Sequence, residues 1–266
     1  MNASLKLALI GANGMLAQGI KAIVPASFDL IELDLPDFDI TRQDQVMSMI
    51  KPLAPDVIIN CAAYTHVDGC ETHEALAFSV NGEGPGYLAQ AALAVGAVLV
   101  HISTDYVFSG DKTEPYVEDD LTGPVSAYGR SKLMGEKSIL SSGLLHYFIL
   151  RTSWLYGMRG KNFVETILRL AAGEELRVVS DQQGSPTYTE DLANAIFVLL
   201  GSKSQPGVYH LSNTGSCSWY EFAVEIVQQA RENQLPVKVD RVIPIRTADY
   251  PLPAKRPAYS VFSKQK

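Results

Sequence analysis

The sequence predicts an α/β protein with a Rossmann-type, doubly wound parallel sheet and a smaller C-terminal α/β lobe. Short apolar runs alternate with helical patterns five times in the first 172 residues, and the first run ends in a glycine turn. The runs are apolar at successive positions, so both faces of the sheet must be covered, which is typical of parallel strands with helices on each side. Right-handed crossovers then place ligands at the carboxyl ends of the strands.

Each strand–helix pair consists of a run rich in aliphatic residues, a turn, and a segment with apolar residues at helical spacing. In chain order the pairs are residues 5–10 and 14–22, 28–34 and 43–51, 57–60 and 71–94, 97–103 and 126–140, and 146–152 and 162–172.

The alternation loosens after Thr152. Pro and Gly gather near residues 183–187, and two more helical patterns follow at 190–200 and 219–232. We expect residues 1–155 to form the dinucleotide-binding and catalytic unit. Residues 156–266 are expected to form a smaller substrate lobe interleaved with it.

Composition excludes several functional classes. The 266 residues are 47% hydrophobic and carry a formal net charge of −7, so the chain lacks the overall basic charge of a nucleic-acid or membrane-surface binder. The three cysteines form no disulfide framework or CxxC motif, and His66, His73 and His101 show no metal-ligand spacing. No secretory signal or membrane span is evident, so we expect a cytoplasmic protein.

The first strand leads into a dinucleotide-binding turn of the form GxxGxxA, residues 11–17. Gly11 permits the tight turn, Gly14 lets the backbone approach a pyrophosphate, and the small Ala17 allows close packing of helix and strand. The residues of this turn expected to bind the cofactor are Gly11, Asn13, Gly14, Met15 and Leu16.

Asp34 lies 20 residues past Gly14, where a carboxylate would bond a ribose hydroxyl. It favours the unphosphorylated cofactor by repelling a 2′-phosphate, but both NADH and NADPH stay open. Asp39 and Ile40 could line the adenine pocket or simply lead into the next helix.

Tyr128 and Lys132 form a YxxxK spacing at the start of a helical pattern, so the phenol and the ammonium share a helix face. A nearby ammonium stabilises phenolate and should lower the pKa of Tyr128. Such a phenol can protonate a carbonyl oxygen during hydride transfer. Thr104, at the end of a strand, can bond the same oxygen.

Thr104, Tyr128 and Lys132 in this order resemble the catalytic set of the extended short-chain dehydrogenase/reductase superfamily. Five further blocks resemble the dTDP-4-dehydrorhamnose reductase family: residues 60–68 (NCAAYTHVD), 103–108 (STDYVF), 151–157 (RTSWLYG), 180–187 (SDQQGSPT) and 256–257 (RP). The resemblance implies NAD(P)H-dependent reduction of the C4 ketone of dTDP-4-dehydro-β-L-rhamnose to dTDP-L-rhamnose. Tyr128 would be the proton donor, and Lys132 would lower its pKa and hold the nicotinamide ribose. Thr104 would position the ketone oxygen.

The same resemblance implies further contacts. Ala62, Ala63 and Tyr64 would pass close to the cofactor. The dTDP-linked 4-keto-6-deoxysugar would meet Thr104, Asp105, Tyr106, Trp154 and Arg256, with Arg256 near the diphosphate. Trp154 could equally be a core aromatic residue, and Arg256 a solvated surface residue.

Two features of the sequence bear on a metal site and on the oligomeric state. Family members usually continue past the position of Lys266 into a further helix that can take part in dimer formation and a magnesium site. We therefore predict no metal, and leave monomer and homodimer open. Met15 also offers no acidic ligand.

Three rival functions remain. A 4,6-dehydratase would need Thr-Asp-Glu after the fourth strand, whereas the third position here is Tyr106. An epimerase is separated from a reductase by net consumption of NAD(P)H. A non-catalytic NAD(P)-binding regulatory subunit, of the kind found with methionine adenosyltransferase, is disfavoured by the intact Thr104, Tyr128 and Lys132.

Overall fold

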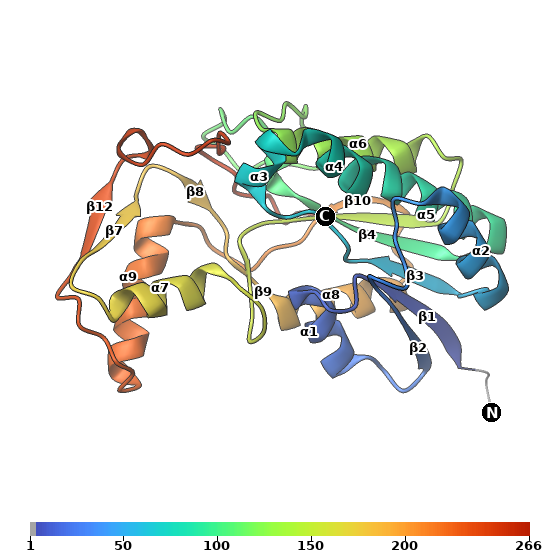
Figure 1. The fold of residues 1–266 in the computed structure, drawn as a ribbon, viewed down its shortest axis with the longest axis horizontal. Helices are drawn as coiled ribbons and strands as arrows, with labels where there is room; N and C mark the ends of the chain where they lie inside the picture. The colour runs from blue at the N-terminus through green and yellow to red at the C-terminus, as the bar shows by residue number, and fades with distance from the viewer. Residues whose placement is uncertain (1–3) are drawn as a thin grey trace.

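Six parallel strands form the central sheet of the computed structural model, which describes residues 4–266 (Figure 1). The strands lie in the order β10-β5-β4-β3-β1-β2, and every neighbouring pair is parallel. Their bounds are β1 Leu5–Ile10, β2 Phe28–Leu33, β3 Val57–Asn60, β4 Val98–Thr104, β5 Tyr147–Thr152 and β10 Gly207–His210. The predicted α/β class with a doubly wound sheet is confirmed.

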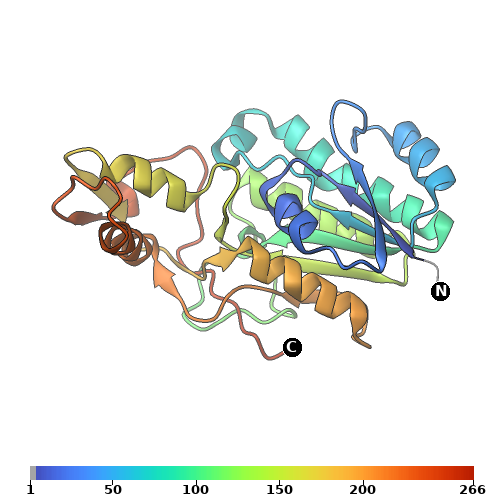
Figure 2. The ribbon, with the colours of Figure 1, turned by 90° about the horizontal axis from the view of Figure 1, so that it is seen from below.

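Helices cover both faces of this sheet (Figure 2). One face carries α1 Met15–Ile23 and α8 Thr189–Gly201, and the other carries α2 Gln43–Leu53, α5 Gly84–Val95 and α6 Ala127–Leu140. Strand side chains alternate between the two cores, as the strand period of two requires. In β1, Leu7 and Leu9 pack with α1 and α8, whereas Ala8 and Ile10 pack with the opposite helices.

The strand order creates a crevice between β1 and β3. The chain leaves β1 for β2 on one side and then returns to β3 on the other, so the two crossovers diverge there. Ligands of open α/β sheets bind at such a switch point, beyond the carboxyl ends of the strands. Gly11 directly follows β1 and Cys61 directly follows β3, so both lie at this crevice.

A smaller lobe lies beside the sheet, on the left in Figure 1. It consists of α7 Phe163–Ala171, β7 Leu176–Val179, α9 Trp219–Glu232, β12 Val242–Ile245 and the 3₁₀ turn η3 Thr247–Asp249. β7 and β12 pair in parallel, and the lobe has its own apolar core, which includes Ile167, Ile226 and Val242. The pairs β6 Leu155–Tyr156 with β9 Thr187–Tyr188, and β8 Gln183–Gly184 with β11 Cys217–Ser218, lie on the connecting segments.

The chain crosses between these two parts more than once. After β9 it returns to form α8, which packs against α1, and later β10, which extends the large sheet beside β5. The division into residues 1–155 and 156–266 stays a prediction.

The expected continuous helix over residues 71–94 is wrong. The segment is divided into α3 Val67–Thr72, α4 Glu74–Phe78, the π-helical turn η1 Ser79–Glu83, and α5. His73 leaves helical geometry at φ −120° and so separates α3 from α4. Pro85 has no N–H to donate to the carbonyl of Asn81, which helps to explain the wider turn.

No helix within residues 4–266 is long and apolar enough to cross a membrane.

Candidate active site

A cavity of about 220 Å³ lies at the carboxyl ends of β1 and β3. Its lining includes seven of the predicted cofactor residues: Gly11, Gly14, Asp34, Asp39, Ile40, Ala62 and Ala63. Asn13, Met15, Leu16 and Tyr64 flank these positions in the chain but are not among the lining residues that the structure describes.

The turn after β1 is shaped to admit a ligand close to the backbone. Gly11 has φ +74°, and a Cβ there would lie 2.6 Å from the backbone nitrogen of Ala62. Gly14 is the N-cap of α1 and has no side chain that could cap the helix. The N–H groups of the first helical turn are therefore not capped by a side chain of this residue. A bare turn and a positive helix end fit a dinucleotide pyrophosphate.

Asp34 is fixed by the same turn. Its Oδ2 accepts a hydrogen bond from the Asn13 N–H at 2.7 Å, and its Oδ1 accepts one from the Leu35 N–H at 2.7 Å. Each carboxylate oxygen keeps a further acceptor site for a ribose hydroxyl. Asp39 instead turns toward the start of α2, where its Oδ1 accepts from the N–H and hydroxyl of Thr41.

Thr104, Tyr128 and Lys132 are supplied by two adjacent elements. Thr104 ends β4 and precedes the 3₁₀ turn η2 Asp105–Val107, while Tyr128 and Lys132 lie one turn apart on α6. Ser126 caps α6 by accepting from the Gly129 N–H, which fixes where the helix begins. The ring of Tyr106 packs edge-on against Tyr128, with centroids 5.4 Å apart.

The expected lowering of the Tyr128 pKa by Lys132 is not found. Burial raises the pKa of Tyr128, and the Thr104 hydroxyl lies close enough to oppose part of that shift. The Lys132 ammonium instead donates to the Ile102 carbonyl at 2.6 Å. Burial lowers the pKa of Lys132 to about 8. The phenol is therefore held in its protonated form.

Asp105 follows Thr104 in the chain and is almost completely buried. Its Oδ1 accepts from the Thr104 hydroxyl at 3.0 Å, while its Oδ2 has no partner among residues 4–266. Burial raises the pKa of this carboxyl to about 6. Asp105 thus orients the Thr104 hydroxyl.

Asn81 is a site residue that the sequence reasoning missed. It is fully buried in η1, and its amide both accepts from the Tyr64 N–H at 2.8 Å and donates to the Tyr64 carbonyl at 3.1 Å. It also donates to the Ser131 hydroxyl at 3.1 Å on α6. Asn81 therefore links the chain after β3 to the catalytic helix. The one sequence signal was Pro85, four residues further on.

A second cavity, of about 820 Å³, lies between the sheet and the smaller lobe. Tyr106, Ser109 and Val125 line it from the sheet side, and residues of α7, β7 and the C-terminal segment line it from the other. Three cationic side chains lie in its wall: Arg177, Lys255 and Arg256. Their positive charge suits a phosphorylated ligand.

Arg256 lies in this wall, but its guanidinium is already paired. Its Nη1 and Nη2 donate to Asp68 Oδ1 at 2.8 Å and Oδ2 at 2.7 Å, a bidentate contact between α3 and the C-terminal segment. The hydrogen bonds from Arg256 lower the pKa of Asp68.

Trp154 is not among the residues that line the larger cavity, whereas Trp219 is. The two indoles stack with centroids 3.5 Å apart. Gly184 packs directly against Trp154, and a Cβ at position 184 would lie 2.4 Å from the indole ring. Trp219, which the sequence reasoning did not select, therefore lines this cavity in place of Trp154, together with the aromatic residues Tyr106, Phe163 and Tyr250.

The predicted residues thus gather at two adjoining places. Cys61 lines the smaller cavity, and the positive charge of Lys132 lowers the pKa of its thiol in opposition to burial. Tyr106 lines the larger cavity and packs against the ring of Tyr128. Through these two neighbours, Lys132 lies near the smaller cavity and Tyr128 near the larger one. Such a site can deliver a hydride and a proton to a carbonyl group.

Comparison with known proteins agrees with this geometry. Residues 5–266 match the family model for the RmlD substrate binding domain. The dTDP-4-dehydrorhamnose reductase of Sinorhizobium fredii is 43% identical over 96% of this chain and 88% of its own length. The crystal structure of the Bacillus anthracis dTDP-4-dehydrorhamnose reductase in complex with NADP superposes with a TM-score of 0.93 at 43% identity, covering 98% of this chain and 91% of that chain.

A third relative carries a different name. A probable dTDP-4,6-dihydroxy-2-methyloxan-3-one 4-ketoreductase of Streptomyces antibioticus is 41% identical over 95% of this chain and 85% of its own length. Taken together, the fold, the paired cavities and these similarities show that the chain belongs to the dTDP-4-dehydrorhamnose reductase family, which the RmlD substrate binding domain describes.

Proposed function

We propose that this protein catalyses the NAD(P)H-dependent reduction of the C4 ketone of dTDP-4-dehydro-β-L-rhamnose to dTDP-L-rhamnose. The observation that carries the proposal is that neighbours of the Thr104, Tyr128 and Lys132 set line both cavities: Cys61, near Lys132, lines the smaller one, and Tyr106, packed on Tyr128, lines the larger one. The reductases at 43% identity support it. When bound, a reduced nicotinamide supplies the hydride.

Tyr128 is the proton donor in this proposal. Its raised pKa keeps the phenol protonated at neutral pH, so a proton is available when negative charge develops on the ketone oxygen. Thr104 donates a second hydrogen bond to that oxygen after turning from Asp105. Lys132, one helical turn after Tyr128 on α6, would hold the nicotinamide ribose.

The cofactor site uses backbone more than side chains. The turn at Gly11 and Gly14 would receive the pyrophosphate, and Asp34 would accept from a ribose hydroxyl. Ala62 and Ala63 also line this cavity.

Substrate binding is assigned to the larger cavity. Arg256, steadied by Asp68, would contribute a cation to the diphosphate, and Tyr106 would contact the sugar beside Tyr128. Residues 1–155 would supply most of the cofactor and catalytic groups, and residues 156–266 much of the substrate pocket.

A second candidate is reduction of another dTDP-linked ketosugar. The Streptomyces antibioticus relative, named for a different 4-keto substrate, is nearly as similar as the dTDP-4-dehydrorhamnose reductases. Comparing kcat/KM for 4-ketosugars that differ at C2 and C3 separates the two candidates.

The test of the proposed role of Tyr128 is Tyr128→Phe. This variant removes the phenol O–H and leaves the ring in place, so we expect turnover to fall by about two to four orders of magnitude, in line with loss of a general acid. Cofactor affinity, measured by fluorescence titration, should change less than threefold. A variant that turns over at the wild-type rate contradicts the assignment.

A further inference from the structure

A buried ion pair between Glu136 and Arg151 lies next to the catalytic set, and the proposed reaction does not use it. Glu136 on α6 accepts from Arg151 of β5 through two bonds, Nε to Oε1 at 3.0 Å and Nη2 to Oε2 at 2.8 Å. The Ser103 hydroxyl of β4 donates to the same Oε1 at 2.5 Å. All three side chains are at least 95% buried, so their partners must satisfy them.

The position of these residues ties them to the catalytic groups. Glu136 follows Lys132 by one helical turn, so the two share a face of α6. Ser103 directly precedes Thr104 and pairs in register with Arg151 across β4 and β5. A movement of Glu136 would therefore change the distance between the helix that carries Lys132 and the strand that carries Thr104.

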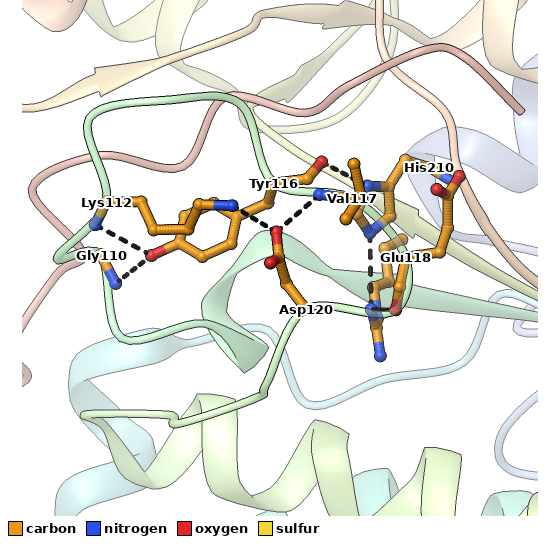
Figure 3. Close-up of polar contacts among 8 residues, drawn as sticks. Gly110, Lys112, Tyr116, Val117, Glu118, Asp120 and His210 are labelled. Atoms are coloured by element: carbon orange, nitrogen blue, oxygen red, sulfur yellow. Dashed lines mark hydrogen bonds and ion pairs between the residues drawn. The ribbon is translucent and has the colours of Figure 1, made fainter.

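The other side of Arg151 is held as firmly. Its Nη1 donates to the Glu118 carbonyl at 3.1 Å and lies 3.4 Å from His210 Nε2. Figure 3 shows His210 joined in turn to Glu118 and to the Tyr116 carbonyl. With Nδ1–H donating to that carbonyl, Nε2 is free to accept from Arg151, so His210 is neutral. Burial lowers the pKa of His210 to about 3, in agreement.

Lys132 faces few other charges. Cys61, directly after β3, and His101 on β4 lie close enough for the Lys132 charge to affect their pKa values. Burial raises the pKa of Cys61 to about 12 and lowers that of His101, so both are neutral near pH 7. Burial likewise keeps the Tyr128 phenol protonated. Within residues 4–266, Glu136 is thus the one ionised carboxylate that raises the pKa of Lys132 against burial.

We propose that Glu136 is a positioning residue for the reduction, which clamps α6 to β4 and β5 and holds a negative charge toward the Lys132 ammonium. This inference rests on the proposed function, because it assigns Glu136 a task in that reaction. The inference goes beyond the proposed function because it names a group that touches neither cofactor nor substrate. Arg151, with its own supports, keeps the Glu136 carboxylate in place.

The sign of the expected effect follows from the charge. Removing the Glu136 carboxylate withdraws a stabilising partner from the ammonium, so Lys132 would lose its proton at a lower pH. Activity that requires protonated Lys132 would then fall off earlier on the alkaline side. A purely structural role for the ion pair would lower activity equally at every pH.

The experiment compares two ion pairs on the same helix. The double variant Glu136→Gln with Arg151→Met removes both buried charges and leaves neither one unpaired. The control, Glu74→Gln with Arg130→Met, removes the exposed pair between α4 and α6, whose atoms lie 3.0 Å apart. For each protein, kcat and kcat/KM are measured from pH 6 to pH 10 by cofactor oxidation, and folding is checked by urea unfolding.

Glu136, and not Arg151, raises the pKa of Lys132, so the alkaline limb of the buried-pair variant should still move to lower pH when both charges are removed. We expect a shift of up to about one pH unit, which is a loss of activity of up to about tenfold at the pH of the wild-type limb. The control should keep the wild-type limb. Glu136→Asp keeps the charge while shortening the clamp, so it should lower kcat severalfold without moving the limb. If the double variant does not fold, Glu136→Asp still tests whether the length of the Glu136 side chain affects kcat.

The inference is overturned if the folded double variant keeps the wild-type limb, or if Glu136→Asp moves the limb as far as the double variant does. An NMR titration of the Lys132 side chain reads the same shift without turnover. If the wild-type protein reduces none of the dTDP-4-ketosugars, the proposed function fails. The NMR titration then still tests the charge of Glu136 by itself.

Discussion

Gly11→Ala perturbs the cofactor turn at the point where the backbone leaves no room for a side chain. At φ +74° an L-residue is strained by about 1–2 kcal/mol. The new Cβ would also lie 2.6 Å from Ala62 N and 2.7 Å from Ala62 Cα, and such overpacking costs about 1–3 kcal/mol. The free energy of unfolding should therefore fall by about 2–5 kcal/mol. Because Ala62 lines the smaller cavity, its displacement should weaken cofactor binding at least tenfold.

Gly96→Ala is the matched control for this prediction. Gly96 has the same φ of +74° at the end of α5, but apart from its chain neighbours no residue within 4–266 has an atom within 4 Å of the position that a Cβ would take. It should lose only the strain, about 1–2 kcal/mol, and keep wild-type cofactor affinity. Urea unfolding and fluorescence titration with NADH and NADPH measure both effects. Equal losses of stability in the two variants, or an unchanged cofactor affinity in Gly11→Ala, would refute the steric argument.

Two further predictions concern carboxylates of the site. The folded-state pKa of Asp105, about 6, lies above the ordinary 3.8, so the stability it contributes is full below pH 4 and is lost as pH rises through 6. Asp105→Asn should therefore gain stability relative to wild type between pH 4 and pH 7 in urea unfolding, and a pH-independent difference would contradict this. Asp68→Asn breaks a partly exposed pair, so it should cost about 1 kcal/mol or less of stability. It should raise KM for the dTDP-sugar severalfold by releasing Arg256, and an unchanged KM would argue against the assigned place of Arg256.

The main sheet could be predicted from sequence because its signals are local. The first five strands are short runs rich in apolar residues, and the glycine turn after β1 marks the switch point by itself. Strand β10 was missed because Gly207–His210 is short and mixed in character. The paired strands of the small lobe are two to four residues long, and their pairing joins segments up to 66 positions apart. The residue pattern within either segment therefore cannot predict which segment it pairs with.

The candidate site was predicted where chemistry follows a motif, and less well where it depends on tertiary contacts. The spacing of Tyr128 and Lys132 placed them together, but it could not show that Lys132 would turn to the Ile102 carbonyl. The partner of Arg256 lies 188 residues away at Asp68, beyond the reach of any spacing rule.

The most direct test of the central claim is the stoichiometry of cofactor oxidation. Purified protein would be given excess NADPH or NADH and a limiting amount of dTDP-4-dehydro-β-L-rhamnose, with absorbance at the nicotinamide band and product chromatography followed together. We expect one equivalent of cofactor to be oxidised per equivalent of ketosugar, with dTDP-L-rhamnose as the product. Conversion of the sugar without net oxidation, as in an epimerase, or no oxidation of either cofactor, would contradict it.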